Sequence, residues 1–86
     1  MALQILARAS NLYMDNNEYI RLIKAYSFWA NIGHCQKHYT HDSVFFIVKD
    51  NNSFQTIKFY NDSQDYRVSG LCETLSDAYN EAFHTL

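Results

Sequence analysis

Between Asp42 and Tyr60 the chain reads Val44-Phe45-Phe46-Ile47-Val48, then the polar Lys49-Asp50-Asn51-Asn52-Ser53, then Phe54-Gln55-Thr56-Ile57-Lys58-Phe59-Tyr60. The two apolar runs predict the strands of a β-hairpin, because Asn and Asp in the connecting segment tolerate the positive φ of a tight turn. The first run is apolar at every position, which is typical of a strand covered on both faces. The second run alternates, so we expect one of its faces to be partly exposed to water.

Two segments with helical periodicity flank this hairpin. Asp15 precedes Glu18 by three residues, the spacing of a capping box, and the apolar pattern that follows predicts a helix from Asp15 to about Asn31 that ends near Gly33. A second apolar stripe predicts a helix from about Leu71 to His84; its members are Leu71, Leu75, Ala78, Tyr79, Ala82 and Phe83.

Two further segments are ambiguous, and we favour a strand only for the first of them. Residues 3–13 fit a strand or one helical turn followed by a loop, and Tyr66-Arg67-Val68 fits a short third strand or the approach to the second helix. The elements predict one domain over residues 1–86 of the α+β class. We expect a small two-layer sandwich: an antiparallel β-sheet built on the central hairpin, packed against two helices on one face. One core is expected to contain Phe46, Ile23, Leu75 and Tyr79.

Composition limits the classes of function. Seven Lys and Arg against nine Asp and Glu give a formal net charge of −2, which offers no basic footprint for a nucleic acid. The longest uninterrupted apolar run has five residues, so no membrane insertion is expected. Two cysteines and a start without the pattern of a secretory leader favour the cytoplasm over a secreted, disulfide-bonded domain. A domain of 86 residues buries a limited core, which favours a partner or self-association.

Few residues suggest chemistry. His34, Cys35, His38 and His41 form the candidate metal cluster, since the histidines would share one face of a helix, and Cys72 or Asp42 would complete four ligands. Gly33 interrupts such a helix, and structural zinc sites usually show two paired sets of ligands, so we expect no metal at this site and no cofactor. Two glycines leave no phosphate-binding loop, and nothing aligns a cysteine nucleophile with a base. We therefore expect no enzymatic activity.

The loop after the hairpin is the candidate partner-binding site. It joins two aromatic residues to two carboxylates, namely Tyr60, Asp62, Asp65 and Tyr66. Its polar composition predicts a surface position, and exposed Tyr beside acidic groups suits docking against a basic protein surface. The alternative is an ordinary solvated loop with one Tyr packed into the core.

A resemblance to a known family rests on scattered residues. They are His38-Tyr39-Thr40-His41-Asp42, the strand end Val48-Lys49-Asp50, Phe59-Tyr60 before an acidic loop, and Cys72 ahead of an apolar helix with Tyr79. Together they resemble the dGTPase inhibitor of short-tailed coliphages, and the similarity extends to Leu12-Tyr13 and Phe28, with gaps before Asp42 and in the hairpin. It covers most of the chain, but none of the matching residues forms a catalytic signature.

The resemblance implies a function without chemistry of its own. A protein of this kind is phage-encoded, acts in the host cytoplasm, and binds and blocks a host dGTP triphosphohydrolase, expected to be oligomeric, so that phage DNA synthesis keeps its dGTP. Two alternatives stay open. One is another phage counter-defence protein that inhibits a nuclease or a CRISPR-type complex, and the other is a small His/Cys metal-binding domain.

Overall fold

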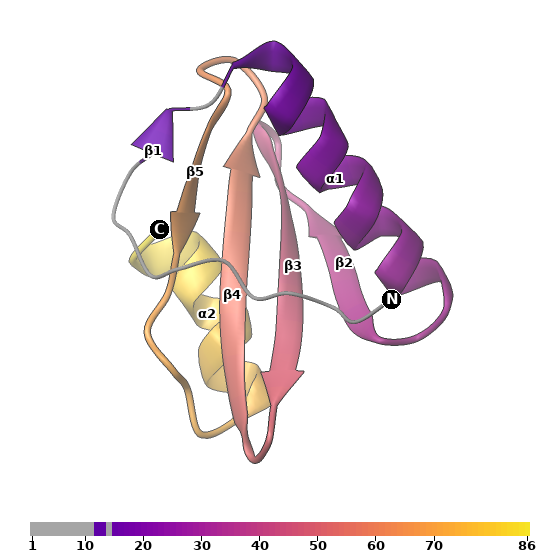
Figure 1. Cartoon of the computed structure of the whole chain (residues 1–86). Helices are drawn as coiled ribbons and strands as arrows, with labels where there is room; N and C mark the ends of the chain where they lie inside the picture. Colours follow the sequence, from indigo (N-terminus) through magenta and orange to yellow (C-terminus); the bar gives the residue numbers. More distant parts are fainter. Residues whose placement is uncertain (1–11, 14) are drawn as a thin grey trace.

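The computed structural model describes residues 12–13 and 15–86 of the chain. Its elements, in chain order, are β1 (Leu12–Tyr13), α1 (Asn16–Asn31), β2 (Cys35–Tyr39), β3 (Ser43–Asp50), β4 (Ser53–Tyr60), β5 (Asp65–Val68) and α2 (Leu75–His84). The strands form one antiparallel sheet in the order β1-β5-β4-β3-β2 (Figure 1). The α+β class, with an antiparallel sheet and two helices, is confirmed.

The predicted hairpin is the centre of this sheet. β3 and β4 pair from Ser43 and Tyr60 at one end to Asp50 and Ser53 at the turn. The turn places Asn51 at a φ of 57°, which asparagine tolerates better than most residues. Every residue of β3 from Ser43 to Val48 is buried, as the apolar run predicts.

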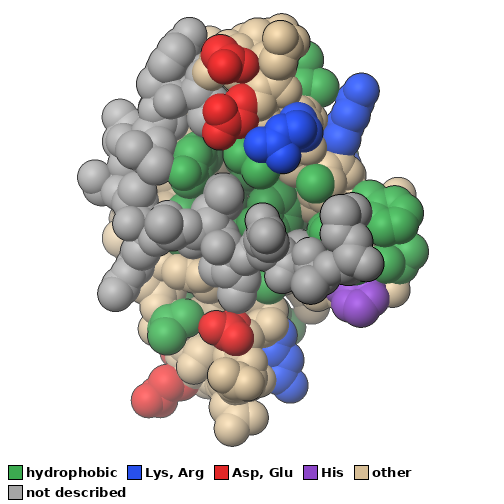
Figure 2. All heavy atoms as spheres, in the orientation of Figure 1, with side chains coloured by type: hydrophobic (Ala, Val, Ile, Leu, Met, Phe, Trp, Pro, Cys, Tyr) green, Lys and Arg blue, Asp and Glu red, His purple; other side chains and the backbone are tan. Residues whose placement is uncertain are grey.

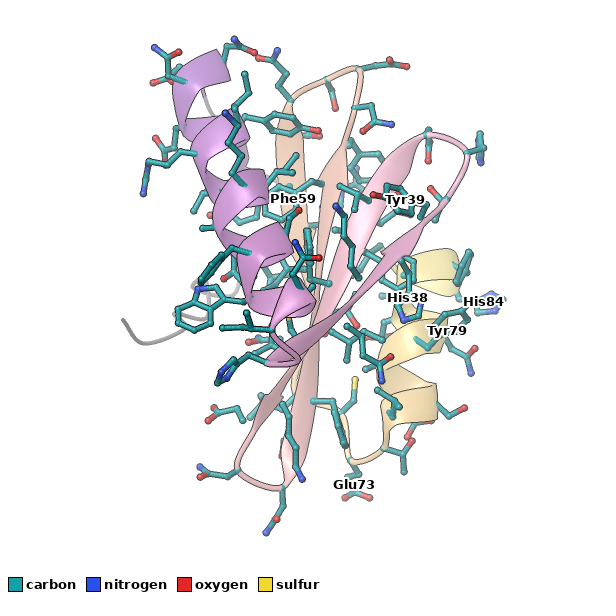
Figure 3. The ribbon with its side chains drawn as sticks, turned by 90° about the vertical axis from the view of Figure 1, so that its right-hand side faces the viewer. His38, Tyr39, Phe59, Glu73, Tyr79 and His84 are labelled. Carbon is teal, nitrogen blue, oxygen red and sulfur yellow. The ribbon has the colours of Figure 1, made fainter. Side chains whose placement is uncertain are left out.

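The two helices cover opposite faces of the sheet, which corrects the expected two-layer arrangement (Figures 1 and 3). Side chains of alternate β3 residues enter two separate cores, because successive residues of a strand point to opposite faces. The α1 core contains Tyr19, Tyr26, Val44, Phe46, Val48, Ile57, Phe59, Tyr66 and Val68. The α2 core contains Phe45, Ile47, Ala78 and Ala82. The prediction that Phe46 and Ile23 share a core with Leu75 and Tyr79 is therefore wrong.

Capping interactions set the ends of both helices. Asp15 accepts a hydrogen bond from the Glu18 backbone N–H at 2.9 Å, and Gly33 closes α1 at a φ of 85°, both as predicted. The second helix starts later than predicted, at Leu75, because Thr74 accepts from the Asp77 N–H at 3.0 Å. The preceding Cys72 instead exchanges two backbone hydrogen bonds with Phe54, at 2.7 and 2.8 Å.

The outer segments complete the sheet. Tyr66–Val68 belong to β5, which is one of the two alternatives for this segment, whereas β2 was not predicted. Of the ambiguous segment 3–13, Leu12 and Tyr13 form β1 and pair with β5, and residues 3–11 lie outside the described part of the chain. Neither described helix is long and apolar enough to cross a membrane.

Neither face of β4, the second hairpin strand, is open to water, contrary to the prediction. Thr56 and Lys58, on the face of β4 under α2, are 0% and 7% exposed. Thr56 Oγ1 donates to the Ala78 carbonyl oxygen at 2.5 Å, and Lys58 Nζ donates to the Ala82 carbonyl oxygen at 2.7 Å. Polar groups can be buried when they are hydrogen-bonded, and the backbone of α2 supplies the acceptors here.

Candidate protein-binding surface

The candidate metal ligands do not come together. His34 packs against the Trp29 ring, with centroids 5.1 Å apart, at the end of α1. Cys35 packs against the α1 core, whereas His38 stacks on Phe45 on the opposite face. His41 lies in a turn, with its side chain 93% exposed. Among the described residues, no group of three His, Cys, Asp or Glu side chains could hold a metal ion.

The surroundings of both cysteines favour the protonated thiol. Burial raises the pKa of the Cys35 thiol, and its sulfur lies 3.5 Å from the Tyr26 carbonyl oxygen. Burial also raises the pKa of the Cys72 thiol, and the nearby Glu81 carboxylate adds to that rise. Both thiols are free. Since a nucleophilic cysteine needs a lowered pKa, neither environment favours a thiolate.

The predicted partner-binding residues are split between two surroundings. Tyr66 is 7% exposed and packs on Phe59 in the α1 core, with ring centroids 5.9 Å apart. Tyr60 lies on the α2 face, where its hydroxyl donates to the Leu86 carbonyl oxygen and its ring contacts Lys58 and Arg67. Asp62 is exposed and Asp65 half-buried. One Tyr is thus in the core, as the alternative expected, and partner binding by the loop stays a prediction.

Hydrogen bonds hold the turn that carries these carboxylates against two other segments. Tyr19 Oη donates to the Tyr60 carbonyl oxygen at 2.6 Å, and Gln64 Nε2 donates to Asn16 Oδ1 at 2.8 Å. The Asn61 N–H donates to the Asp42 carbonyl oxygen at 3.0 Å. Carboxylates from three segments therefore gather at one end of the molecule, here called the acidic end: Glu18, Asp42, Asp62 and Asp65. Acidic side chains are visible there, over the start of α1, at the top of Figure 2.

Electrostatics reflect this gathering. Burial raises the pKa of Tyr19, and the carboxylates of Asp65 and Asp62 raise it further. Burial likewise raises the pKa of Tyr66, with Glu18 adding to the rise. The carboxylates of Glu18, Asp62 and Asp65 therefore lie close enough to these two tyrosines to act on their ionisation.

A second surface, which the sequence did not predict, lies where α2 faces β2. It is here called the aromatic surface and consists of His38, Leu75, Tyr79 and Phe83. The Tyr79 ring lies 5.2 Å from His38 and 5.1 Å from Phe83, measured between centroids, and both Tyr79 and Phe83 contact the buried Phe45. Figure 3 shows His38 and Tyr79 side by side between β2 and α2.

The aromatic surface is open to solvent although it is apolar. Leu75, Tyr79 and Phe83 are 38%, 40% and 49% exposed. Their helical spacing predicts burial, but only Ala78 and Ala82 of the same stripe are fully buried, because α2 packs on the sheet through these small residues. The sequence does carry one sign of this arrangement, because the stripe on α2 mixes two alanines with larger apolar residues.

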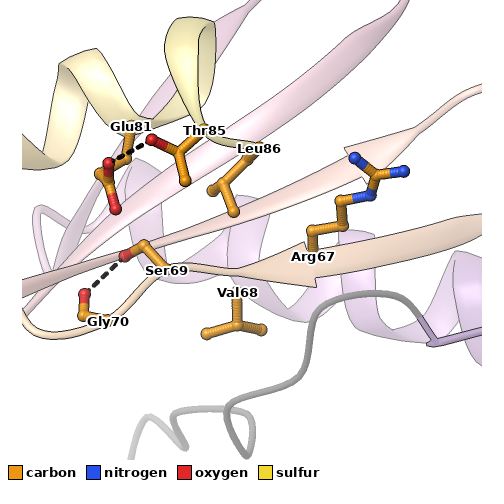
Figure 4. Close-up of a pocket in the computed structure, with 7 residues that line it drawn as sticks. All are labelled: Arg67, Val68, Ser69, Gly70, Glu81, Thr85 and Leu86. Carbon is orange, nitrogen blue, oxygen red and sulfur yellow. Dashed lines mark hydrogen bonds between the residues drawn. The ribbon is translucent and has the colours of Figure 1, made fainter.

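A cavity of about 450 Å³ lies between the end of α2 and β5 (Figure 4). Its lining residues are Arg67, Val68, Ser69, Gly70, Glu81, Thr85 and Leu86. Arg67 Nε is buried without a hydrogen-bond partner, and Glu81 accepts from Thr85 Oγ1 at 2.7 Å. The cavity thus brings together one cation, the guanidinium of Arg67, and the carboxylate of Glu81.

Comparison with known proteins finds no match: no family model, no curated protein and no solved structure is significantly similar to this chain.

Proposed function

We propose that this chain is a small non-enzymatic protein-binding inhibitor, encoded by a phage, that binds and blocks a host enzyme in the host cytoplasm. The observation that carries the proposal is the aromatic surface, where three large apolar side chains remain 38–49% exposed on one helix. The resemblance of the sequence to the dGTPase inhibitor of short-tailed coliphages suggests that the enzyme is a host dGTP triphosphohydrolase.

The energetics of a small domain support this reading. Fully burying one such side chain is worth roughly 1.5–3 kcal/mol, and a chain of 86 residues has few other sources of stability. The same helix nevertheless buries only alanines completely. Aromatic side chains that are left accessible on a rigid helix are typical of binding hot spots, which are enriched in Trp, Tyr and Arg.

The acidic end supports the proposed target. An enzyme that binds a nucleoside triphosphate presents cationic groups around the phosphates, since Arg and Lys are the usual phosphate ligands. The carboxylates of Glu18, Asp62 and Asp65 are complementary to such a rim. Contact there would obstruct entry of the substrate without any chemistry by the inhibitor.

An inhibition assay tests the proposal. Purified bacterial dGTP triphosphohydrolase is titrated with the chain, and we expect stoichiometric loss of dGTP hydrolysis. Replacing Tyr79 and Phe83 together by Ala should weaken inhibition about tenfold or more, because hot-spot truncations cost about 2 kcal/mol or more. The matched control is Ile20→Ala, which removes a side chain of similar exposure, 41%, from the other helix.

Melting temperatures of both variants separate lost contact from lost folding. No inhibition and no complex on gel filtration would contradict the dGTPase as target. Affinity capture of the tagged chain from a bacterial lysate then identifies the host protein, and recovery of a nuclease or CRISPR-type complex would favour the other counter-defence function.

A further inference from the structure

β2 forms one edge of the sheet, and part of its backbone groups point away from β3. The Thr40 N–H donates to the Ser43 carbonyl oxygen at 2.9 Å. Because hydrogen-bonded and non-bonded pairs alternate along antiparallel strands, Gln36 and His38 point their backbone groups toward β3. Cys35, Lys37 and Tyr39 point theirs outward. Within the described part of the chain, no backbone hydrogen bond from outside the sheet reaches these three residues.

The free edge lies between two different sets of side chains. Figure 3 looks onto it and shows β2 crossing between α1 and α2. On the α2 face, His38 adjoins the aromatic surface through its 5.2 Å contact with Tyr79. On the α1 face, Lys37 Nζ lies 5.3 Å from the centre of the Tyr39 ring, and Tyr39 is 69% exposed. A strand added here would meet an apolar surface on one face and a cation on the other.

Charge decides which occupant fits. Residues 34–41 contain Lys37 and three histidines and no carboxylate. A second copy that paired antiparallel about the middle of β2 would place Lys37 opposite its own counterpart, and like charges directly opposite each other are destabilising. Lysine on an edge strand is a common means of preventing such self-pairing. A partner strand with a carboxylate opposite Lys37 would instead form an attractive cross-strand pair.

We propose that an extended segment of a partner protein adds to the sheet beside β2, with acidic side chains facing Lys37 and apolar side chains facing His38 and the aromatic surface. The proposal rests on the function proposed above and specifies how that partner is bound. Backbone hydrogen bonds to Cys35, Lys37 and Tyr39 would provide affinity, and the alternation of acidic and apolar side chains would provide specificity.

Amide hydrogen exchange of the isotope-labelled chain, followed by NMR, tests this directly. The probe is the capped peptide Thr-Glu-Val-Glu-Val-Glu-Thr, and the control peptide carries Lys in place of Glu. At saturating acidic peptide we expect exchange of the Cys35, Lys37 and Tyr39 amides to slow about tenfold or more, while Gln36 and His38, already bonded to β3, stay unchanged. The basic peptide should leave all five amides unchanged.

A charge reversal supplies the second arm. Lys37→Glu should reverse which peptide binds, so that the basic peptide and not the acidic one slows exchange at the edge of β2. The control is Lys49→Glu, at an exposed site on β3. This variant should still be protected by the acidic peptide, like the original chain. The two peptides on the original chain decide the matter even if Lys37→Glu does not fold.

Three results would overturn the proposal: no slowing at the outward amides, equal slowing by both peptides, or slowing that depends on protein concentration without peptide, which would identify a second copy as the occupant. The dGTP hydrolysis assay is independent of this one. Inhibition without peptide protection would reject only the strand addition, and protection without inhibition would reject only the proposed target enzyme.

Discussion

Tyr19 is the residue at which the core, the acidic end and the predicted docking loop meet. Its ring packs edge-on against Phe59, with centroids 6.0 Å apart, and its hydroxyl donates to the Tyr60 carbonyl oxygen at 2.6 Å. The hydroxyl therefore ties the start of α1 to the end of β4. Deprotonation would remove this donor and place a new negative charge near Asp65 and Asp62.

The raised pKa of Tyr19 predicts a loss of stability in alkaline solution. Because the folded state holds the proton more tightly than the unfolded state, the stabilising contribution is present below the unfolded value of 10.0 and is lost as pH rises through the folded pKa. We expect the melting temperature to fall above about pH 10, and to fall less steeply in Tyr19→Phe. Tyr39→Phe, at a 69% exposed position, should follow the original chain. Identical slopes for all three proteins would show that Tyr19 does not contribute.

The end of α1 is the element-scale feature on which the placement of β2 depends. The Gly33 N–H donates to the Ala30 carbonyl oxygen at 3.1 Å, and the His34 N–H donates to the Trp29 carbonyl oxygen at 2.9 Å. This pair of bonds is a Schellman motif, which requires a left-handed residue at Gly33. The reversal directs the chain straight into the edge strand at Cys35.

Replacing Gly33 by Ala should destabilise the protein through the backbone alone. An added Cβ at Gly33 meets no atom within 4 Å, so no steric clash contributes. The left-handed conformation at a φ of 85° costs an L-residue about 1–2 kcal/mol. We expect urea unfolding to show a loss of about that size for Gly33→Ala and a smaller loss for Gly33→Asn, since asparagine tolerates this region. Equal stability of all three would mean that the helix ends differently in solution.

At the scale of the whole molecule, one sheet separates two cores of unequal size. The α1 core is rich in aromatic rings, with Phe46 5.4 Å from Tyr26 and 5.9 Å from Phe59 between centroids. The α2 core rests on alanines and the buried Phe45. The smaller core leaves the larger side chains of α2 outside, and this arrangement creates the aromatic surface.

Phe46→Ala should therefore remove the centre of the larger core. Phe46 is 0% exposed, and truncating a buried Phe costs about 3–5 kcal/mol, because the cavity collapses only in part. For a domain of marginal stability this is enough to unfold a large fraction of the molecules. Thermal unfolding followed by circular dichroism measures the effect, with the 53% exposed Phe28→Ala as control. A Phe46→Ala variant that melts like the original chain would contradict the assignment of the two cores.

The acidic end carries a prediction about binding. Asp62→Lys combined with Asp65→Lys should weaken binding to the proposed host enzyme about tenfold or more at low salt, where charge effects are largest, with unchanged melting. Asp50→Lys, at the exposed hairpin turn, is the control. Unchanged affinity of the double variant at low salt would remove the loop from the interface.

The sequence by itself determined the elements whose signals are local. Alternation and apolar runs defined the hairpin, Asp15 and Gly33 marked the ends of α1, and the acidic loop after Tyr60 was correctly placed at the surface, because capping, turn and strand preferences act over a few residues. Partner binding by that loop stays a prediction. The predicted start of α2 was wrong because the apolar stripe continues back to Leu71. Thr74, which caps the helix, is a weaker signal in the sequence than that stripe.

Only the tertiary structure decided which face of each helix and strand is buried and which is exposed. Five-residue β2 has no apolar alternation and exists because β3 offers a partner edge. Lys58 and Thr56 look solvent-exposed in sequence, but carbonyl groups of α2 receive their hydrogen bonds. The aromatic surface arises because Ala78 and Ala82, rather than Tyr79 and Phe83, meet the sheet. Each outcome depends on contacts between residues far apart in the chain, which periodicity along one segment does not encode.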